Sequence, residues 1–491
     1  MIVLAVCGLI VLPSLAAIGL LVFRLREGAP QITLAVVSTM MVAALAIGWR
    51  VVERGPQLAA GDWVYIDQLG VVVLVLIALV GVCAALNSLS YIRHDVDRGE
   101  LRPQDVSRYY AFFLIFMATM VTVPVVNNLG LMWVAIEATT IVSVLLVSIY
   151  RHGRSLEAAW KYLVLASVGI AIALFGTMMT YYAASTALGE SSSALNWTAL
   201  RAGSVHLDPE VMRLAFVFIV IGYGTKVGLA PMHTWLPDAH SQAPSPVSGL
   251  LSGVLLNCAL YAVLRFKILT SESAGPGYTD NILIAFGLFS IVLAVPFLIV
   301  QHDIKRLLGY HSVEHMGIIV LAVGIGGRTA LYAAMLHMVA HSLTKSSLFF
   351  AAGAAVQTFS SRSMHRMKGL VKVAPVPGAA LILGAFALAG LPPFAMFNSE
   401  YGLVAGAFSG GQAVIGVAGI LFITFAAASL LYHVVGTAYG EPRPTIKRQT
   451  NSSALMLSVI APLVILLWIS VAPPQRFEQT MEDAVTIVEG H

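Results

Sequence analysis

The chain has 491 residues, of which 58% are hydrophobic and 11% are charged, and its mean hydropathy is +0.86. A soluble domain carries roughly 25% charged residues, so this composition excludes a protein whose whole surface faces water. The net charge of +4 is small and the basic residues are spread over many loops, which excludes a nucleic-acid-binding surface.

Apolar runs separated by charged or Pro/Gly-rich loops predict fourteen membrane spans of about 20 residues or more. Because a bilayer offers no water to backbone polar groups, we expect helices, and hence an all-α polytopic membrane protein. The alternating pattern of a transmembrane β-barrel is absent from the sequence. The predicted spans lie near 2–24, 31–53, 68–92, 109–127, 129–150, 160–187, 211–237, 246–271, 280–300, 306–326, 328–356, 374–408, 412–438 and 454–473.

Lys and Arg residues are distributed unequally between the two sets of loops. The loops after odd-numbered spans hold eighteen of them, including Lys447 and Arg448, whereas the other loops and the C-terminal tail hold eight, including Arg265. Loops rich in Lys and Arg remain on the cytoplasmic side. We therefore expect both termini on the outer side of the membrane, which agrees with an even number of spans.

Two predicted spans are interrupted by glycine and proline. VGLAP at 227–231 lies in span seven, and AGLPP at 389–393 lies in span twelve. Interrupted spans at matching places in two halves predict a transporter built from repeats, with the breaks at the ion path. Because the two spans are five apart, the repeats would be inverted in the membrane. The alternative is a chance proline kink in each span.

Ionisable residues within the apolar runs are the candidate functional residues, because such groups are rare in membranes and usually functional. Span eleven carries His337, His341 and Lys345 at positions i, i+4 and i+8, which places all three on one helical stripe. A buried carboxylate and lysine can exchange a proton when a neighbouring charge changes, since one charge at ~6 Å and an effective dielectric of ~20 contributes ~3 kcal/mol. The alternatives are structural ion pairs, satisfied core histidines and snorkelling lysines. The main candidates are Glu137, Lys226, His337, His341, Lys345 and Glu400, and the secondary ones are His311, Glu314, His315 and His433.

Two patterns bear on metals and cofactors. HSVEH at 311–315 matches a zinc-peptidase motif, but it heads a membrane helix and lacks a third ligand and a substrate cleft, so we expect no metal there. Cys7, Cys83 and Cys258 lie far apart inside apolar runs and form no CxxC pair. We therefore expect this chain to bind no cofactor.

Four segments resemble a known family: WVAIEATT (133–140), GTKVGLAPMHTWLPDAHSQAPSPVSGLLSG (224–253), HMVAHSLTKSSLFF (337–350) and GLPPFAMFNSE (390–400). The chain resembles the antiporter-like proton-conducting membrane subunits of complex I, Mrp antiporters and group 4 NiFe hydrogenases. Within that family it looks most similar to the F-type component of hydrogenase-4.

The resemblance implies about fourteen helices with two inverted five-helix repeats. Its domains would be helices 1–3 (1–108), a first repeat (109–271), a second repeat (280–438), and helix 14 with the C-terminal tail (439–491). Glu137 and Lys226 match the family's glutamate of span five and lysine of span seven. His337, His341 and Lys345 match its central relay, and Glu400 its terminal site. The sequence departs from the family at Asn257, where many members carry lysine or histidine.

The resemblance also implies a function and partners. The expected function is proton or Na⁺ translocation in a redox-driven complex of the prokaryotic inner membrane, most similar to a group 4 NiFe hydrogenase or formate hydrogenlyase. NiFe and iron–sulfur centres would lie on a peripheral hydrogenase-like arm, beside other membrane-arm subunits. The alternatives are a subunit of an Mrp-type Na⁺/H⁺ antiporter, of a complex I-like NADH:quinone oxidoreductase, or a non-conducting structural subunit, which Asn257 would favour.

Overall fold

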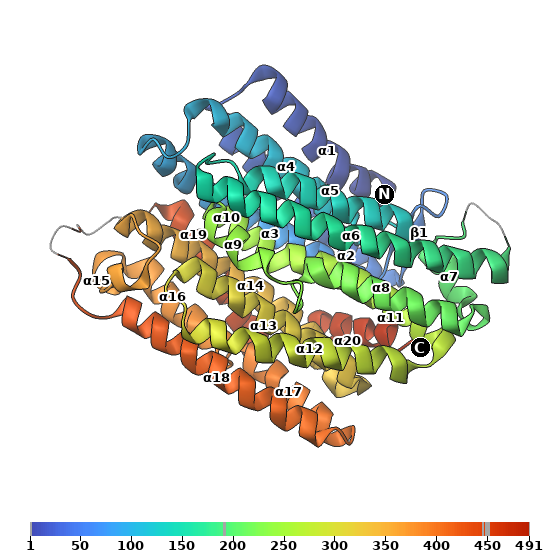
Figure 1. Cartoon of the computed structure of the whole chain (residues 1–491). Coiled ribbons are helices and arrows are strands. Elements are labelled where there is room, and N and C mark those ends of the chain that lie inside the picture. Colours follow the sequence, from blue (N-terminus) through green and yellow to red (C-terminus); the bar gives the residue numbers. More distant parts are fainter. Residues whose placement is uncertain (1, 190–192, 444–445, 447–451, 491) are drawn as a thin grey trace.

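The computed structural model describes residues 2–189, 193–443, 446 and 452–490, and these are mostly helical (Figure 1). Lys447 and Arg448 lie outside the described residues. The first half contains α1 (Ile2–Phe23), α2 (Ala29–Arg54), the antiparallel strands β1 (Gln57–Ala59) and β2 (Val64–Ile66), α3 (Gln68–Asp97), α4 (Val106–Thr122), α5 (Leu129–Val147), α6 (Gly153–Leu188), α7 (Trp197–Ala202), α8 (Pro209–Val227), α9 (Trp235–Gln242), α10 (Ser245–Leu250) and α11 (Leu256–Ala274). The second half contains α12 (Pro276–Ile299), α13 (Ile304–Ile325), α14 (Gly327–Phe359), α15 (Leu370–Val373), α16 (Pro375–Leu388), α17 (Ala395–Ser409), α18 (Ala413–Ala438), α19 (Ser453–Val471) and α20 (Gln475–Glu489).

Ten helical segments in the described residues are long and apolar enough to cross a membrane. The other four predicted spans coincide with α4, with α14, and with the helix pairs α8–α9 and α16–α17. The chain is therefore a mostly helical, multi-pass membrane protein, with one short two-stranded sheet. The total of fourteen spans and the division into two inverted repeats stay predictions.

The helices run side by side across Figure 1, with the two ends of the chain, β1 and α7 at the right and α15 at the left. The apolar stretches of α13 and of the segment from α10 to α11 are completely buried, whereas only 28% to 33% of those of α1, α18 and α19 are buried. The fully enclosed helices are thus among those that carry the candidate functional residues.

Both predicted helix breaks are present. α8 ends at Val227, and the next residue, Gly228, has a φ of +86°, which favours glycine. The amide of Leu229 donates to the carbonyl of Gly224 at 2.8 Å, closing the helix end as a C-cap. The second break separates α16 from α17, and Gly390 there has a φ of +64°. Each break thus depends on a glycine as well as on the prolines.

Three helices were not predicted from the sequence: the one-turn helix α15, α7 and α20. α7 lies in the long loop between spans six and seven. α20 occupies the predicted C-terminal tail and packs against α3, α11 and α14. It buries Met481, Ala484 and Val485 on one face and exposes charged residues on the other, so it is an amphipathic helix outside the apolar runs.

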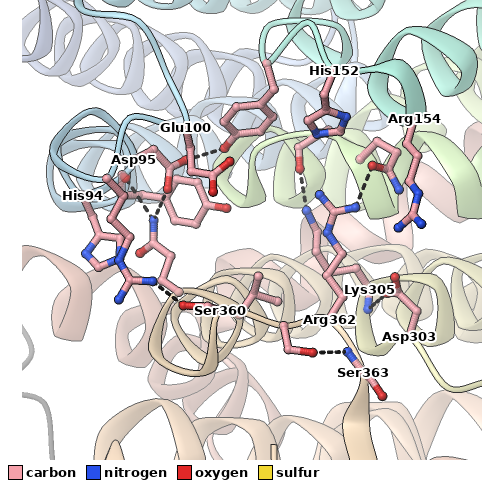
Figure 2. A pocket seen from close by; sticks show the side chains of 18 of the residues that line it. His94, Asp95, Glu100, His152, Arg154, Asp303, Lys305, Ser360, Arg362 and Ser363 are labelled. Atoms are coloured by element: carbon pink, nitrogen blue, oxygen red, sulfur yellow. Dashed lines mark hydrogen bonds between the residues drawn. The ribbon is translucent and has the colours of Figure 1, made fainter. Parts of the chain in front are cut away.

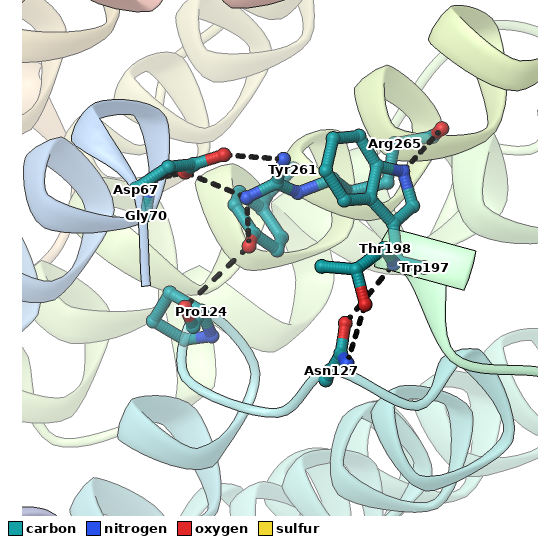
Figure 3. A network of polar contacts seen from close by, with 8 residues as sticks. All are labelled: Asp67, Gly70, Pro124, Asn127, Trp197, Thr198, Tyr261 and Arg265. Atoms are coloured by element: carbon teal, nitrogen blue, oxygen red, sulfur yellow. Dashed lines mark hydrogen bonds and ion pairs between the residues drawn. The ribbon is translucent and has the colours of Figure 1, made fainter. Parts of the chain in front are cut away.

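Arg265 is buried in α11 and does not lie in an outer loop, which corrects the sequence analysis (Figure 3). Its guanidinium donates to both carboxylate oxygens of Asp67 at 2.7 Å and to the hydroxyl of Tyr261 at 2.7 Å. It also lies 4.2 Å from the ring centroid of Trp197. The sequence alone could not reveal this ion pair, because Asp67 and Arg265 lie in distant segments of the chain.

We expect Asp67→Asn to destabilise the protein by about 3–5 kcal/mol, because it leaves the Arg265 charge buried without its counter-ion. Asn keeps the shape of the side chain and its cap on the amide of Gly70. The measurement is denaturant unfolding of the purified chain in detergent. Glu482→Gln is the control, since the Arg328–Glu482 pair is exposed and should change stability by no more than about 1 kcal/mol. Equal effects of the two substitutions would contradict the prediction.

Candidate functional site

Lys226 lies in the last turn of α8, directly before the first break, and is fully buried. Its ammonium donates to the hydroxyls of Thr140 and Tyr162, each at 2.7 Å. Trp235, the first residue of α9, stacks on the Tyr162 ring with centroids 4.3 Å apart and donates to the carbonyl of Thr225 at 2.8 Å. The break thus brings Trp235 against Tyr162, while the hydroxyl groups around the lysine come from α5 and α6.

Glu137 lies on α5 and is partly exposed at the surface of the chain. Its Oε1 accepts a hydrogen bond from Ser167 at 2.9 Å, and its buried Oε2 has no partner among the described residues. No ion pair within the described residues joins Glu137 and Lys226, although their charges interact. Thr140, one helical turn after Glu137, contacts Lys226 instead. The expected pair therefore interacts through its charges, without a direct hydrogen bond among the described residues.

Asn257 connects the two halves of the chain. Its Nδ2 donates to Ser342 Oγ at 2.8 Å and to the carbonyl of Gly253 at 3.2 Å. Ser342 follows His341 on α14, so Asn257 joins the first half of the chain to the helix that carries the histidines. Its buried Oδ1 has no partner among the described residues. The link is polar but carries no ionisable group.

Three histidines meet between α13 and α14. Nδ1 of His315 lies 2.9 Å from Nε2 of His337, and Nδ1 of His337 lies 2.8 Å from Ser399 Oγ. The rings of His315 and His341 have centroids 5.6 Å apart. Neither ring nitrogen of His341 has a hydrogen-bond partner among the described residues. This cluster continues the path from α14 to α17, where Ser399 precedes Glu400.

His311 and Glu314, which the sequence placed near a span end, are buried inside the protein. Nδ1 of His311 lies 2.9 Å from Glu314 Oε2, and the same oxygen lies 3.6 Å from Nε2 of His315. Lys345 donates to the carbonyl of Leu308 at 2.5 Å, and its charge interacts with that of Glu314. Lys345 is therefore buried and does not snorkel to the membrane surface.

Glu400 lies on α17, just after the second break, and is 7% exposed. A Cβ added to Gly390 would lie 2.1 Å from Glu400 Oε2, so the carboxylate packs directly on the backbone of the break. Its Oε1 has no hydrogen-bond partner among the described residues. Both breaks are thus lined by a buried ionisable side chain, a lysine at the first and a glutamate at the second.

His433 lies at some distance from this arrangement. It is on α18 and is partly exposed. Its Nε2 lies 3.2 Å from the carbonyl oxygens of Leu298 and Ile299, at the end of α12. Such contacts satisfy the ring locally and suit a structural role.

His311, Glu314 and His315 form a group that could hold a metal ion, since their donor atoms lie within 4.8 Å of one another. All three are buried between helices of the bundle, and the carboxylate of Glu314 already contacts both imidazoles. One carboxylate and two imidazoles suit zinc or an equivalent ion. A peptidase would also need a substrate cleft, and the three residues are enclosed by the surrounding helices.

Sequence reasoning missed the hydroxyl groups that connect the ionisable residues. Tyr162, Thr140, Ser342 and Ser399 make the direct contacts to Lys226, Asn257 and His337. Serine, threonine and tyrosine are ordinary in membrane helices, so only their proximity to charged residues in space distinguishes these four.

These side chains, which are all buried except the partly exposed Glu137, form a belt inside the bundle that we call the polar row. Buried ionisable groups of this kind are costly in a membrane and persist where protons or ions pass. Imidazole, hydroxyl and carboxylate groups within hydrogen-bond distance can each accept a proton on one side and release one on the other. The polar row comprises Glu137, Thr140, Tyr162, Lys226, Asn257, Ser342, His341, His315, His337, Glu314, Ser399 and Glu400.

The fold and the polar row define a polytopic membrane protein in which two broken helices flank a belt of buried ionisable groups. The family model described as "NADH:quinone oxidoreductase/Mrp antiporter, TM" matches residues 126–426, and the chain belongs to this family. The matched region contains every ionisable residue of the polar row.

Individual proteins agree with this assignment. The chain is 44% identical over 383 residues to the hydrogenase-4 component F homolog of Methylacidiphilum infernorum, covering 78% of this chain and 80% of that protein. It is 31% identical over 399 residues to NADH-quinone oxidoreductase subunit N of Desulforudis audaxviator, which covers 81% of this chain and 77% of that protein. A chain of the archaeal membrane-bound sulfane sulfur reductase has the same fold, with a TM-score of 0.87 and 22% identity. The match covers 99% of this chain and 98% of that chain.

Proposed function

We propose that this chain translocates protons across the membrane as a subunit of a redox-driven complex. The observation that carries the proposal is the polar row, in which Asn257 is the one step without an ionisable or hydroxyl group. In the proposed order of steps, Glu137 and Lys226 first exchange a proton when the electrostatic interaction between them changes. The proton passes Asn257 and Ser342 by way of water, crosses the histidines, and reaches Glu400.

The breaks support this proposal because they supply free backbone groups and helix ends beside Lys226 and Glu400. Half-helix ends and unpaired carbonyls can order water where a continuous helix would exclude it. A lysine that is switched between charged and neutral states needs such water at its ammonium. The break therefore explains why an apolar helix carries a lysine and then ends.

We propose that the complex resembles a group 4 NiFe hydrogenase, because the 44% identity is to a hydrogenase-4 component F homolog and extends over 80% of it. The NiFe and iron–sulfur centres would belong to partner subunits of a peripheral arm. Glu137 is partly exposed on α5, which suits contact with a neighbouring membrane-arm subunit. The basic loops would face the cytoplasm of a prokaryotic cell and both termini the outer side.

Two alternatives follow from the family, whose description includes both NADH:quinone oxidoreductase and the Mrp antiporter. In the first, the redox arm of the complex oxidises NADH and reduces a quinone instead of carrying out a hydrogenase reaction. In the second, the chain exchanges Na⁺ for protons with no redox arm. Proton movement along the polar row is common to all three.

The test is affinity purification of the tagged chain from its native membrane, followed by mass spectrometry of the proteins that accompany it. Hydrogenase-like and iron–sulfur subunits are expected. NADH-oxidising subunits would favour the complex I-like alternative, and small hydrophobic subunits without any redox protein would favour the antiporter. Purification of the chain with no partner would contradict membership in a complex.

A further inference from the structure

A cavity of ≈ 900 Å³ opens at the end of the bundle that carries α15, outside the polar row (Figure 2). It is bounded by the ends of α3 and α14, the loop before α6, the junction of α9 with α10, and the start of α13. Arg98, Arg154 and Arg362 line it together with Asp95 and Glu100. A polar cavity of this size admits water from the loop side.

Lys305 lines the cavity and is 2% exposed. Its ammonium donates to the carbonyl of Ala243 at 2.5 Å, and its charge interacts with Asp95. Asp95 in turn accepts hydrogen bonds from Tyr150 and Gln357. The proposed path along the polar row does not use Lys305, although a buried lysine beside a hydrated cavity is well placed to bind and release protons.

His152 at the rim does not compete with these groups for protons. Burial and, secondarily, the charge of Arg362 lower the pKa of His152. The ring is thus neutral near neutral pH, and its Nδ1 accepts from the amide of Ser155 at 3.1 Å. His94 and His302 also line the cavity. Lys305 differs from these basic groups because it is buried and contacts Ala243, three residues after His240.

His240 lies between this cavity and the polar row. It is on α9, three residues before Ala243, and is fully buried. Its ring stacks on Phe349 of α14 with centroids 5.0 Å apart, and Phe349 lies one turn after Lys345. The charges of Lys305 and Lys345 both act on His240, and His240 acts on His341. Neither of its ring nitrogens has a partner among the described residues.

We propose that this cavity is an inlet by which protons from the loop side reach the histidines of α13 and α14, with Lys305 and His240 as the proton-carrying residues between them. The inference rests on the proposed function and adds a second access route to it. The route explains how the histidines can be supplied although Asn257 provides no ionisable link to Lys226.

Each transfer along the route conserves charge. A proton from water in the cavity binds to the neutral amine of Lys305, which then releases a proton toward one ring nitrogen of His240. The other ring nitrogen of His240 releases its own proton toward His341. Buried polar groups without protein partners are commonly satisfied by ordered water, so single waters would complete the steps between these groups.

The first test uses the complex purified through a tag on this chain and reconstituted in liposomes. His240→Phe keeps the ring that stacks on Phe349 but removes both nitrogens. We expect it to lower proton translocation by at least about a hundredfold, in the range of lost proton-transfer catalysis, while redox turnover and assembly persist. His240→Glu restores an ionisable group and should recover part of the rate with a shifted pH profile, which a merely structural role would not give.

The result for Lys226→Ala separates this proposal from the proposed function. If Lys226→Ala abolishes translocation and His240→Phe leaves it normal, the polar row conducts but the inlet is refuted. If neither substitution has an effect, the proposed function fails as well. Loss in His240→Phe with no recovery in His240→Glu, in a fully assembled complex, would also count against a proton-carrying histidine.

The second test blocks the cavity itself. Ser361 lines it, and Ser361→Cys is nearly isosteric. A bulky, membrane-impermeant maleimide added from the loop side should stop most proton translocation in this variant. Gln104→Cys is the matched control, because Gln104 is exposed and does not line the cavity. Complete labelling of Ser361→Cys without loss of translocation would overturn the proposal.

Discussion

Lys226→Ala is expected to abolish proton translocation, with a loss of at least about a hundredfold if the lysine carries the proton. The substitution removes the ionisable group that contacts Thr140 and Tyr162 in the first half of the polar row. The two hydroxyls can bond to water in the space left by the side chain, so the helix break and the assembly should persist. The measurement is formation of a pH gradient in inside-out membrane vesicles, normalised to the amount of complex.

Lys372→Ala is the control for this experiment. Lys372 is also a lysine, but it is exposed and pairs with Glu441 at the surface, so its loss should leave translocation unchanged. Near-normal gradient formation by Lys226→Ala would remove the main support for a conducting polar row and would favour a structural subunit.

His337→Phe is expected to cut translocation by at least about a hundredfold. His337 bridges His315 and Ser399, at 2.9 and 2.8 Å, and is the direct contact between the histidine cluster and α17. Phenylalanine fills a similar volume but cannot carry a proton, so the row loses its contact with Ser399, the residue before Glu400. The same vesicle assay measures the effect.

The exposed residue His206 provides the control, since His206→Phe should translocate protons at the normal rate. Ser399 keeps its hydrogen bond to the carbonyl of Met396, but Nδ1 of His315 loses its partner, which costs about 1–3 kcal/mol. The amount of assembled complex must therefore be determined in parallel. Normal translocation by an assembled His337→Phe complex would show that protons bypass this contact.

The helix breaks and the main ionisable members of the polar row could be predicted from the sequence, because such residues are rare within apolar runs. Glycine and proline interrupt apolar runs at 227–231 and 389–393, and Lys226 or Glu400 stands out among apolar neighbours. The stripe formed by His337, His341 and Lys345 followed from helical periodicity alone. Each of these signals is local in the sequence.

Contacts between helices could not be predicted in the same way. The meeting of His315 with His337 depends on how α13 packs against α14, and no local pattern encodes that register. The position of Arg265 was misjudged because its partner Asp67 is 198 residues away. Glu314 was predicted only as a secondary candidate, since burial near a span boundary depends on the neighbouring helices.

The structure shows what surrounds Asn257, the position at which many family members carry lysine or histidine. The side chain bonds directly to Ser342 on α14, so the junction between the two halves is closed by an amide and a hydroxyl. An amide can orient water but cannot hold a proton, which makes this the weakest step of the polar row. A second inlet through Lys305 and His240 would supply the histidines on the far side of that step.

The most direct test of proton conduction along the polar row measures protons moved per electron pair by the reconstituted complex in Na⁺-free buffer. The intact complex should acidify or alkalinise the liposome lumen in step with redox turnover, and a protonophore should collapse the gradient. The double variant Lys226→Ala/His337→Phe should turn over electrons without moving protons. An unchanged ratio of protons to electrons in that variant would contradict conduction along the polar row.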